Sequence, residues 1–241
     1  GENNWHQFDK WPPQNATDKI MYTGNDNQLS FNTDKLSNPE KADALVYTSD
    51  PNKPIPYTDG VHQRRTREYM TDDQRFASRR PDVLVFETEE LTEDLTLAGA
   101  VKANIMAAIS TTDADFVVKI IDVFPDDFSY PKDAISNGEN YPMGGYQMLV
   151  RGEIMRGKFR NSFEKPELFI PEVKTKVSFE LPDVAHTFKK GHRLMIQIQS
   201  SWFPLADRNP QTFTNIYTAS EKDFQTAVIK IFTGKDGTNF N

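Results

Sequence analysis

The stretch GHRLMIQIQSSWFPLADRNP, residues 191–210, decides the fold class. From residue 194 to residue 199, aliphatic side chains at even positions alternate with Met and Gln at odd positions. This two-residue period predicts a β-strand with one buried face. Trp202, Phe203 and Pro204 then precede a polar DRN triplet, which predicts a loop of fixed geometry. We interpret the loop either as a wall of a binding cleft or as a well-packed sheet end.

The same periodicity extends outward to the longest predicted strand, residues 95–109. Eight consecutive odd positions there carry Leu, Gly, Val, Ala or Ile, and Gly99 is expected at a bend or bulge. Residues 116–124 (FVVKIIDVF) are apolar on both faces except at Lys119 and Asp122, which predicts a strand covered on both sides. By parity, Lys119 and Asp122 point to opposite faces.

Shorter strands complete the pattern. In residues 146–156, we expect Tyr146, Met148, Val150 and Ile154 on one face, and residues 234–241 are expected to form a loose tail. Eight or more strands, long loops and no helix beyond two turns predict an all-β fold, an antiparallel β-sandwich or jelly roll formed by residues 1–241 as a single domain. The remaining strands are expected at residues 20–23, 29–31, 44–48, 83–87, 173–181 and 227–231.

Composition excludes several classes of protein. The net charge of −7 argues against a nucleic-acid partner, and no apolar run is long enough to span a membrane. Cysteine is absent, so no disulfide, zinc-thiolate site or thiol nucleophile is available. The first fifteen residues do not resemble a signal peptide and read like the interior of a longer protein, so the compartment stays open.

Two segments lack any apolar period. Residues 1–15 carry Trp5 and Trp11 before a Pro-Pro pair, and their large rings are expected to pack on a surface. Residues 49–81 contain three prolines before Tyr57 and six arginines, among them Arg64 and Arg75. Such a long irregular segment is either a lid whose arginines hold an acidic group or an arm pinned by its own Arg–carboxylate pairs.

Motifs for chemistry are scarce. There is no Gly-x-Ser-x-Gly elbow, phosphate loop, Gly-x-Gly-x-x-Gly or His-Glu-x-x-His, and we predict no catalytic residue, cofactor or metal. A zinc site through His186 and His192, a loop calcium and a glycosidase-like carboxylate pair remain alternatives without specific support. The calcium alternatives are the pairs Asp113 with Asp115 and Asp126 with Asp127, and a charge network is expected among Arg151, Glu153 and Arg156.

A set of longer segments carries a resemblance to a known family. In chain order they are GENNWHQFDKWPP, YTSDPNKPIPY, DQRF, RRPDVLVFET, LAGAVKANIMAAISTTDADFVVKIIDVFPDD, MLVRGEIMRGKFRNSF and FELPDVAHTFKKGHRLMIQIQSSWFPLADRNPQT. From Gly1 to about Phe232, the chain resembles the C-terminal jelly-roll domain of the X-Pro dipeptidyl-peptidase and cocaine-esterase-like hydrolases. Within that family it is most similar to α-amino-acid ester hydrolases and glutaryl-7-aminocephalosporanic-acid acylase-like proteins.

The resemblance implies a non-catalytic domain of a serine hydrolase, with a fold similar to galactose-binding domains. The catalytic Ser, Asp and His would lie on a preceding α/β-hydrolase domain, on which residues 1–15 and 49–81 would pack. The parent would cleave ester, acyl or X-Pro peptide bonds, and a periplasmic or secreted location is favoured. An independent carbohydrate-binding module and a structural homo-oligomerisation domain are the alternatives. Expected cleft or domain contacts are Trp5, Trp11, Tyr57, Arg64, Arg75, Trp202 and Phe203.

Overall fold

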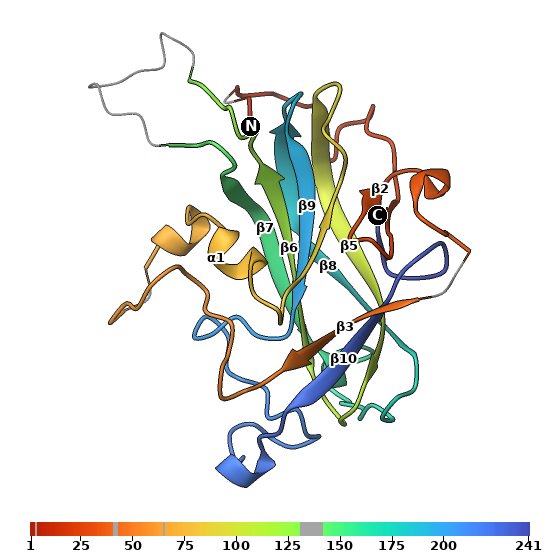
Figure 1. Cartoon of the computed structure of the whole chain (residues 1–241), viewed down its shortest axis with the longest axis vertical. Helices are drawn as coiled ribbons and strands as arrows, with labels where there is room; N and C mark the ends of the chain where they lie inside the picture. The colour runs from red at the N-terminus through yellow and green to blue at the C-terminus, as the bar shows by residue number, and fades with distance from the viewer. Residues whose placement is uncertain (3, 41–42, 65, 131–141) are drawn as a thin grey trace.

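The computed structural model of the chain describes residues 1–2, 4–40, 43–64, 66–130 and 142–241. Two antiparallel sheets stack face to face (Figure 1). The first sheet has the order β2-β1-β11-β5-β10-β3, with β8 on the other edge of β5, and the second has the order β4-β9-β6-β7. The antiparallel β-sandwich expected from the sequence is therefore confirmed.

The first sheet is organised around the long strand β5 (Leu95–Ile109). The strand β8 (Thr175–Phe188) pairs with nearly its whole length, and the register shifts between Gly99 and Val101. Gly99 has a φ of 125°, so the bulge expected there is present and requires glycine. The other strands of this sheet are β1 (Met21–Thr23), β2 (Leu29–Ser30), β3 (Ala44–Ser49), β10 (Ala227–Phe232) and β11 (Asn239–Phe240).

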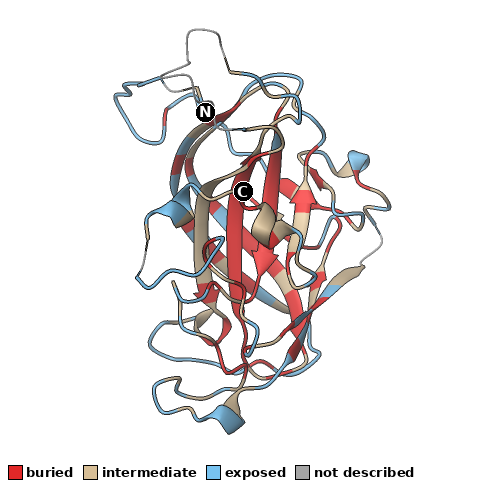
Figure 2. Ribbon diagram, turned by 60° about the vertical axis from the view of Figure 1, so that its left-hand side comes forward, coloured by how far each residue is buried: buried red, intermediate tan, exposed pale blue. Residues whose placement is uncertain are grey.

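The second sheet contains the two strands that the sequence marks most clearly. The strand β6 (Asp115–Val123) lies between β9 (Arg193–Gln199) and β7 (Gln147–Arg156), and β4 (Leu84–Glu87) forms the far edge. Even-numbered residues of β6 and β9 face the first sheet and form the main core, which includes Phe116 and Ile196. Figure 2 shows this buried centre between the layers. Both faces of β6 are buried, as its apolar sequence predicts.

The outer face of the second sheet is covered by the chain's own residues 51–81. This segment contains the short helices η2 (Glu68–Met70) and α1 (Arg75–Ser78), and it buries Ile55 and Ala77 in a cluster with Val83. Because of this cover, the odd-numbered residues Met195, Gln197 and Gln199 of β9 are buried as deeply as the even ones, and only Arg193 at its start is exposed. The expectation of a single buried face for β9 is therefore wrong. The other short helices are η1 (Thr33–Lys35), η3 (Gly157–Phe159) and η4 (Glu221–Asp223).

Two further expectations are corrected. Opposite β6, the partner of Ile120 is Arg151 and the partner of Ile121 is Leu149, so one residue of β7 bulges out of the ladder. This bulge sends Val150 to the main core and Ile154 to the outer cluster, whereas parity placed them on one face. Residues 234–241 are not a loose tail, because β11 pairs with β1 and β5 and Phe240 is fully buried.

Candidate functional site

Trp202, one of the expected contact residues, lies on the outer face of the second sheet. Its ring packs with Tyr57 and Val117. The Tyr69 ring packs against it edge-on, with 6.3 Å between the two ring centroids. A Cβ at Gly152 would lie 2.8 Å from Trp202 Cη2, so the strand needs glycine beneath the ring. Trp202 is only 7% exposed and anchors the covering segment rather than lining an open cleft. Its neighbour Phe203 is 38% exposed and reaches the surface.

Lys119 is the most unusual side chain under this cover. It is fully buried on the outer face of β6, and its Nζ donates a hydrogen bond of 3.0 Å to Gln74 Oε1. Its ammonium group lies 5.3 Å from the Trp202 ring centroid and 5.6 Å from that of Phe76. Burial lowers the pKa of Lys119 to about 7. The amine therefore holds the covering segment to the sheet through Gln74, at a cost in desolvation.

Residues 59–67 form a loop with a closed neck. The Asp72 carboxylate accepts hydrogen bonds from the Thr58 hydroxyl and, at 3.0 Å, from the backbone N–H of Asp59. On the inside of the neck, the Thr66 N–H donates to the Tyr57 hydroxyl at 3.1 Å. Tyr57 is buried, so it supports the loop from below, whereas Arg64 lies exposed near the tip.

Two other arginines of residues 49–81 are paired with carboxylates of the same segment or of the residue just after it. Arg75 Nε donates to Asp73 at 2.6 Å, and Arg80 donates to Asp82 at 2.7 and 2.8 Å. These pairs agree with the interpretation of an arm pinned by internal Arg–carboxylate contacts. Arg65 lies outside the described residues.

The N-terminal segment is held more loosely. Trp5 is fully exposed, while Trp11 is 39% exposed and donates its Nε1–H to Asp183 at 2.6 Å. Phe8 lies 6.2 Å from the Trp11 ring between centroids. The following Pro12 packs at the Gly99 bulge, where a Cβ would meet its Cγ at 3.1 Å. Trp5 therefore has the accessibility that an inter-domain contact requires.

Near the C-terminal end of β6, the buried carboxylate of Asp122 lies between two imidazole groups. The Asp122 carboxylate accepts hydrogen bonds from His186 Nε2 at 2.8 Å and from His192 Nδ1 at 2.7 Å. Burial alone would raise the pKa of Asp122, but these two hydrogen bonds lower it. The sequence did not reveal this pairing, because Asp122 and His192 are 70 residues apart in the chain.

The acidic pair at the β5–β6 turn serves internal contacts. Asp113 accepts from the backbone N–H of Lys158 at 2.9 Å, and Asp115 accepts from Arg156 at 3.0 Å and Asn209 at 2.7 Å. Burial and then the neighbouring Asp115 raise the pKa of Asp113 to about 6. Of the expected network, Arg151 instead donates to the Asp183 carbonyl, and the Glu153 carboxylate accepts from the Ile154 N–H.

Metal ligands do not gather in the described part of the chain. There, no three His, Cys, Asp or Glu side chains are placed to hold a metal ion together. The zinc and calcium alternatives therefore gain no support from the geometry. Asp126 and Asp127 shortly precede residues 131–141, which are among the residues not described.

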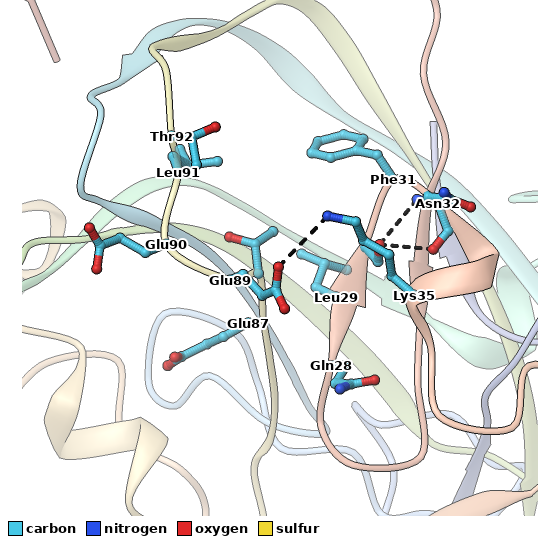
Figure 3. A pocket seen from close by; sticks show the side chains of 12 residues that line it. Gln28, Leu29, Phe31, Asn32, Lys35, Glu87, Glu89, Glu90, Leu91 and Thr92 are labelled. Atoms are coloured by element: carbon cyan, nitrogen blue, oxygen red, sulfur yellow. Dashed lines mark hydrogen bonds and ion pairs between the residues drawn. The ribbon is translucent and has the colours of Figure 1, made fainter.

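A small acidic pocket was not anticipated from the sequence. It has a volume of 260 Å³ and lies between residues 28–35 and the chain that follows β4 (Figure 3). Glu87 lines it, and burial raises the pKa of this carboxyl despite the opposing charge of Arg193. Glu89 and Lys35 also line the pocket and form an ion pair at 3.7 Å (Figure 3). The two segments are far apart in the chain, so only the fold brings these side chains together. Neither segment carries a ligand-binding motif that would have pointed to the pocket.

Comparison with known proteins decides the family. Residues 1–237 match the X-Pro dipeptidyl-peptidase C-terminal non-catalytic domain. The chain belongs to this family. It is 28% identical over 242 residues to cocaine esterase of Rhodococcus sp. (strain MB1 Bresler), a match that covers 98% of this chain and 39% of the esterase.

Two solved structures share the fold at higher identity. One is an aminopeptidase from a marine sediment Thaumarchaeota archaeon, with a TM-score of 0.86 and 39% identity over all of this chain and 38% of that one. The other is an α-amino acid ester hydrolase, with a TM-score of 0.88 and 37% identity over all of this chain and 39% of that one. The chain thus spans less than half the length of these relatives. The resemblance to this hydrolase family is confirmed, and an independent carbohydrate-binding module is not favoured.

Among the described residues, no helix is both long and apolar enough to cross a bilayer.

Proposed function

We propose that this chain packs on an α/β-hydrolase domain of the same polypeptide and helps to shape that domain's substrate cleft. The parent would be a serine hydrolase of ester or amide bonds. The observation that carries the proposal is the family match over residues 1–237, together with relatives more than twice as long that are named as hydrolases. Two fully exposed hydrophobic side chains, Trp5 and Val61, supply apolar surface suited to such a contact.

The proposal separates the role of this chain from that of the catalytic domain. The isolated chain should not hydrolyse amino-acid 4-nitrophenyl esters, whereas the full-length protein should do so in a manner sensitive to serine reagents. The preceding portion without residues 1–241 should lose at least tenfold in kcat/KM. Serine-reagent-sensitive turnover by the isolated chain, or full turnover without it, would exclude the proposal.

A matched pair of valines tests the contact surface. Val61→Ser in the full-length protein should lower kcat/KM, because it removes an apolar contact with the hydrolase domain. Val46→Ser changes a half-exposed valine on β3, an edge strand of the other sheet, and serves as the control. The thermal midpoint of the isolated chain should stay constant in Val61→Ser, which separates a lost domain contact from unfolding. Equal effects of both substitutions on kcat/KM would argue against a contact through residues 59–67.

A further inference from the structure

The strand β8 forms an open edge of the first sheet along its first half. Among the described residues its strand partner is β5 alone. An edge strand with unpaired main-chain groups is a template for pairing with another chain. The second half of β8 is less suited to this, because Pro182 lacks an N–H and Asp183 accepts hydrogen bonds from Trp11 and Arg151. The open part is therefore residues 175–181.

The strand register shows which main-chain groups of this part point outward. Lys102 of β5 exchanges two main-chain hydrogen bonds with Asn241, at 2.6 and 3.0 Å, on the side away from β8. Its partner in β8 is Glu180, so the main-chain groups of Glu180 point away from β5. The same alternation turns the main-chain groups of Lys176 and Ser178 to the open edge. No described segment other than β5 forms a main-chain ladder with these residues.

The side chains along this edge have a symmetric charge pattern. In the sequence KVSFE, residues 176–180, Lys176 and Glu180 stand two positions on either side of Ser178. Both charged side chains are exposed, and neither forms an ion pair with a described residue. Val177 and Phe179 between them are buried in the main core. Opposite charges that face each other across two strands stabilise the pairing, whereas like charges destabilise it.

We infer that residues 176–180 of β8 are a self-association interface, at which two copies of this chain pair antiparallel about Ser178. This register places Lys176 of each copy opposite Glu180 of the other, and the Ser178 residues face each other. Each of these three residue pairs exchanges two main-chain hydrogen bonds. The contact uses the same surface on both copies, so it closes as a two-fold dimer. The charge pattern favours a second copy over an unrelated strand, because only this register makes the edge complementary to itself.

A groove beside the edge supplies further surface for a second copy. It has a volume of 750 Å³ and is lined by residues of β5, β7 and β8 and by residues 159–163. Phe163 at its rim is 79% exposed, so it offers apolar area next to the hydrogen-bonding edge. The inference does not depend on the proposed function, since a hydrolase accessory domain can be monomeric or dimeric.

Charge reversal at the two exposed positions tests the pairing without altering the core. The chain of residues 1–241 should sediment as a dimer at about 100 μM and dissociate on dilution. Lys176→Glu and Glu180→Lys should each raise the dissociation constant at least about tenfold, because like charges then face each other. The double variant Lys176→Glu/Glu180→Lys should restore the dimer. An equimolar mixture of the two single variants should also dimerise, since opposite charges again face each other between the unlike chains.

A single cysteine reports the register, because the chain has none of its own. Ser178→Cys should form a disulfide-linked dimer under mild oxidation, since the opposed Cα atoms of such a pair lie about 5.5 Å apart. Val46→Cys, on the edge strand β3 of the same sheet, is the matched control and should stay uncrosslinked on a denaturing gel. A monomeric chain at about 100 μM would overturn the inference. So would a dimer that is indifferent to charge reversal, or one that crosslinks through Val46→Cys as readily as through Ser178→Cys.

Discussion

Residues 1–15 and residues 49–81 look alike in sequence but behave differently in the structure. Both combine aromatic rings, prolines and charges without an apolar period. The second segment buries Ile55, Tyr57 and Ala77 against the outer face of the β4-β9-β6-β7 sheet, whereas the first leaves Trp5 fully exposed. The difference lies in what is underneath, because that sheet face carries an apolar cluster around Val117 that water would otherwise reach. An irregular segment is therefore held by the surface it covers more than by its own composition.

The largest expected effect comes from removing the ring that joins the covering segment to the sheet. Trp202→Ala should destabilise the isolated chain by about 3–5 kcal/mol, because it leaves a cavity between Tyr69, Lys119 and Gly152. This loss in the free energy of unfolding is measured by urea unfolding monitored by far-UV circular dichroism. Trp5→Ala is the matched control and should leave the midpoint unchanged. Similar midpoint shifts in the two variants would contradict the contrast between the segments.

Much of the fold could be predicted because strand periodicity is local. The alternation at residues 95–109 and 194–199 located β5 and β9. Gly99 correctly marked the bulge in β5. Parity failed in β7, since a bulge at Val150 leaves no trace in the pattern of residues 146–156. It also failed to show that Gln197 is fully buried, because the covering segment lies more than a hundred residues earlier in the chain.

The candidate site was less predictable for the same physical reason. Trp202 was expected near a cleft, but its burial depends on Gly152 and Tyr69, which only tertiary contacts bring to it. The neck of loop 59–67 depends on Asp72, an aspartate that no motif distinguishes from its neighbours. Whether Trp5, Trp11, Tyr57, Arg64, Arg75, Trp202 and Phe203 contact another domain remains a prediction.

A smaller effect, with a defined pH dependence, is expected from the buried amine that the covering segment holds. The folded pKa of Lys119 is depressed from 10.5 to about 7, so the folded chain binds fewer protons than the unfolded chain between these values. The free energy of unfolding therefore rises with pH across that window. Lys119→Met removes the titration, although it leaves Gln74 Oε1 without its donor.

The stability of Lys119→Met relative to the unsubstituted chain should thus be greatest near pH 7 and decline toward pH 10. Urea midpoints of both proteins at pH 7, 8.5 and 10 test this expectation. Lys35→Met, at an exposed position of η1, controls for the loss of one positive charge. A difference between Lys119→Met and the unsubstituted chain that stays constant over this range would show that the amine carries no desolvation cost. The covering segment would then not keep water from the Lys119 ammonium group.

The smallest expected effect belongs to a side-chain hydrogen bond between the N-terminal segment and β8. Trp11→Phe keeps the ring but removes the donor to Asp183, a contact of 2.6 Å at the surface. Because both groups are accessible to water, the loss should be at most about 0.5–1 kcal/mol. Hydrogen exchange should rise in residues 1–15 while residues 49–81 stay protected, since peripheral segments open locally without global unfolding. Trp5→Phe should change neither region. If Trp11→Phe instead lowered the global midpoint as far as Trp202→Ala, the N-terminal segment would be as integral to the sandwich as the covering one.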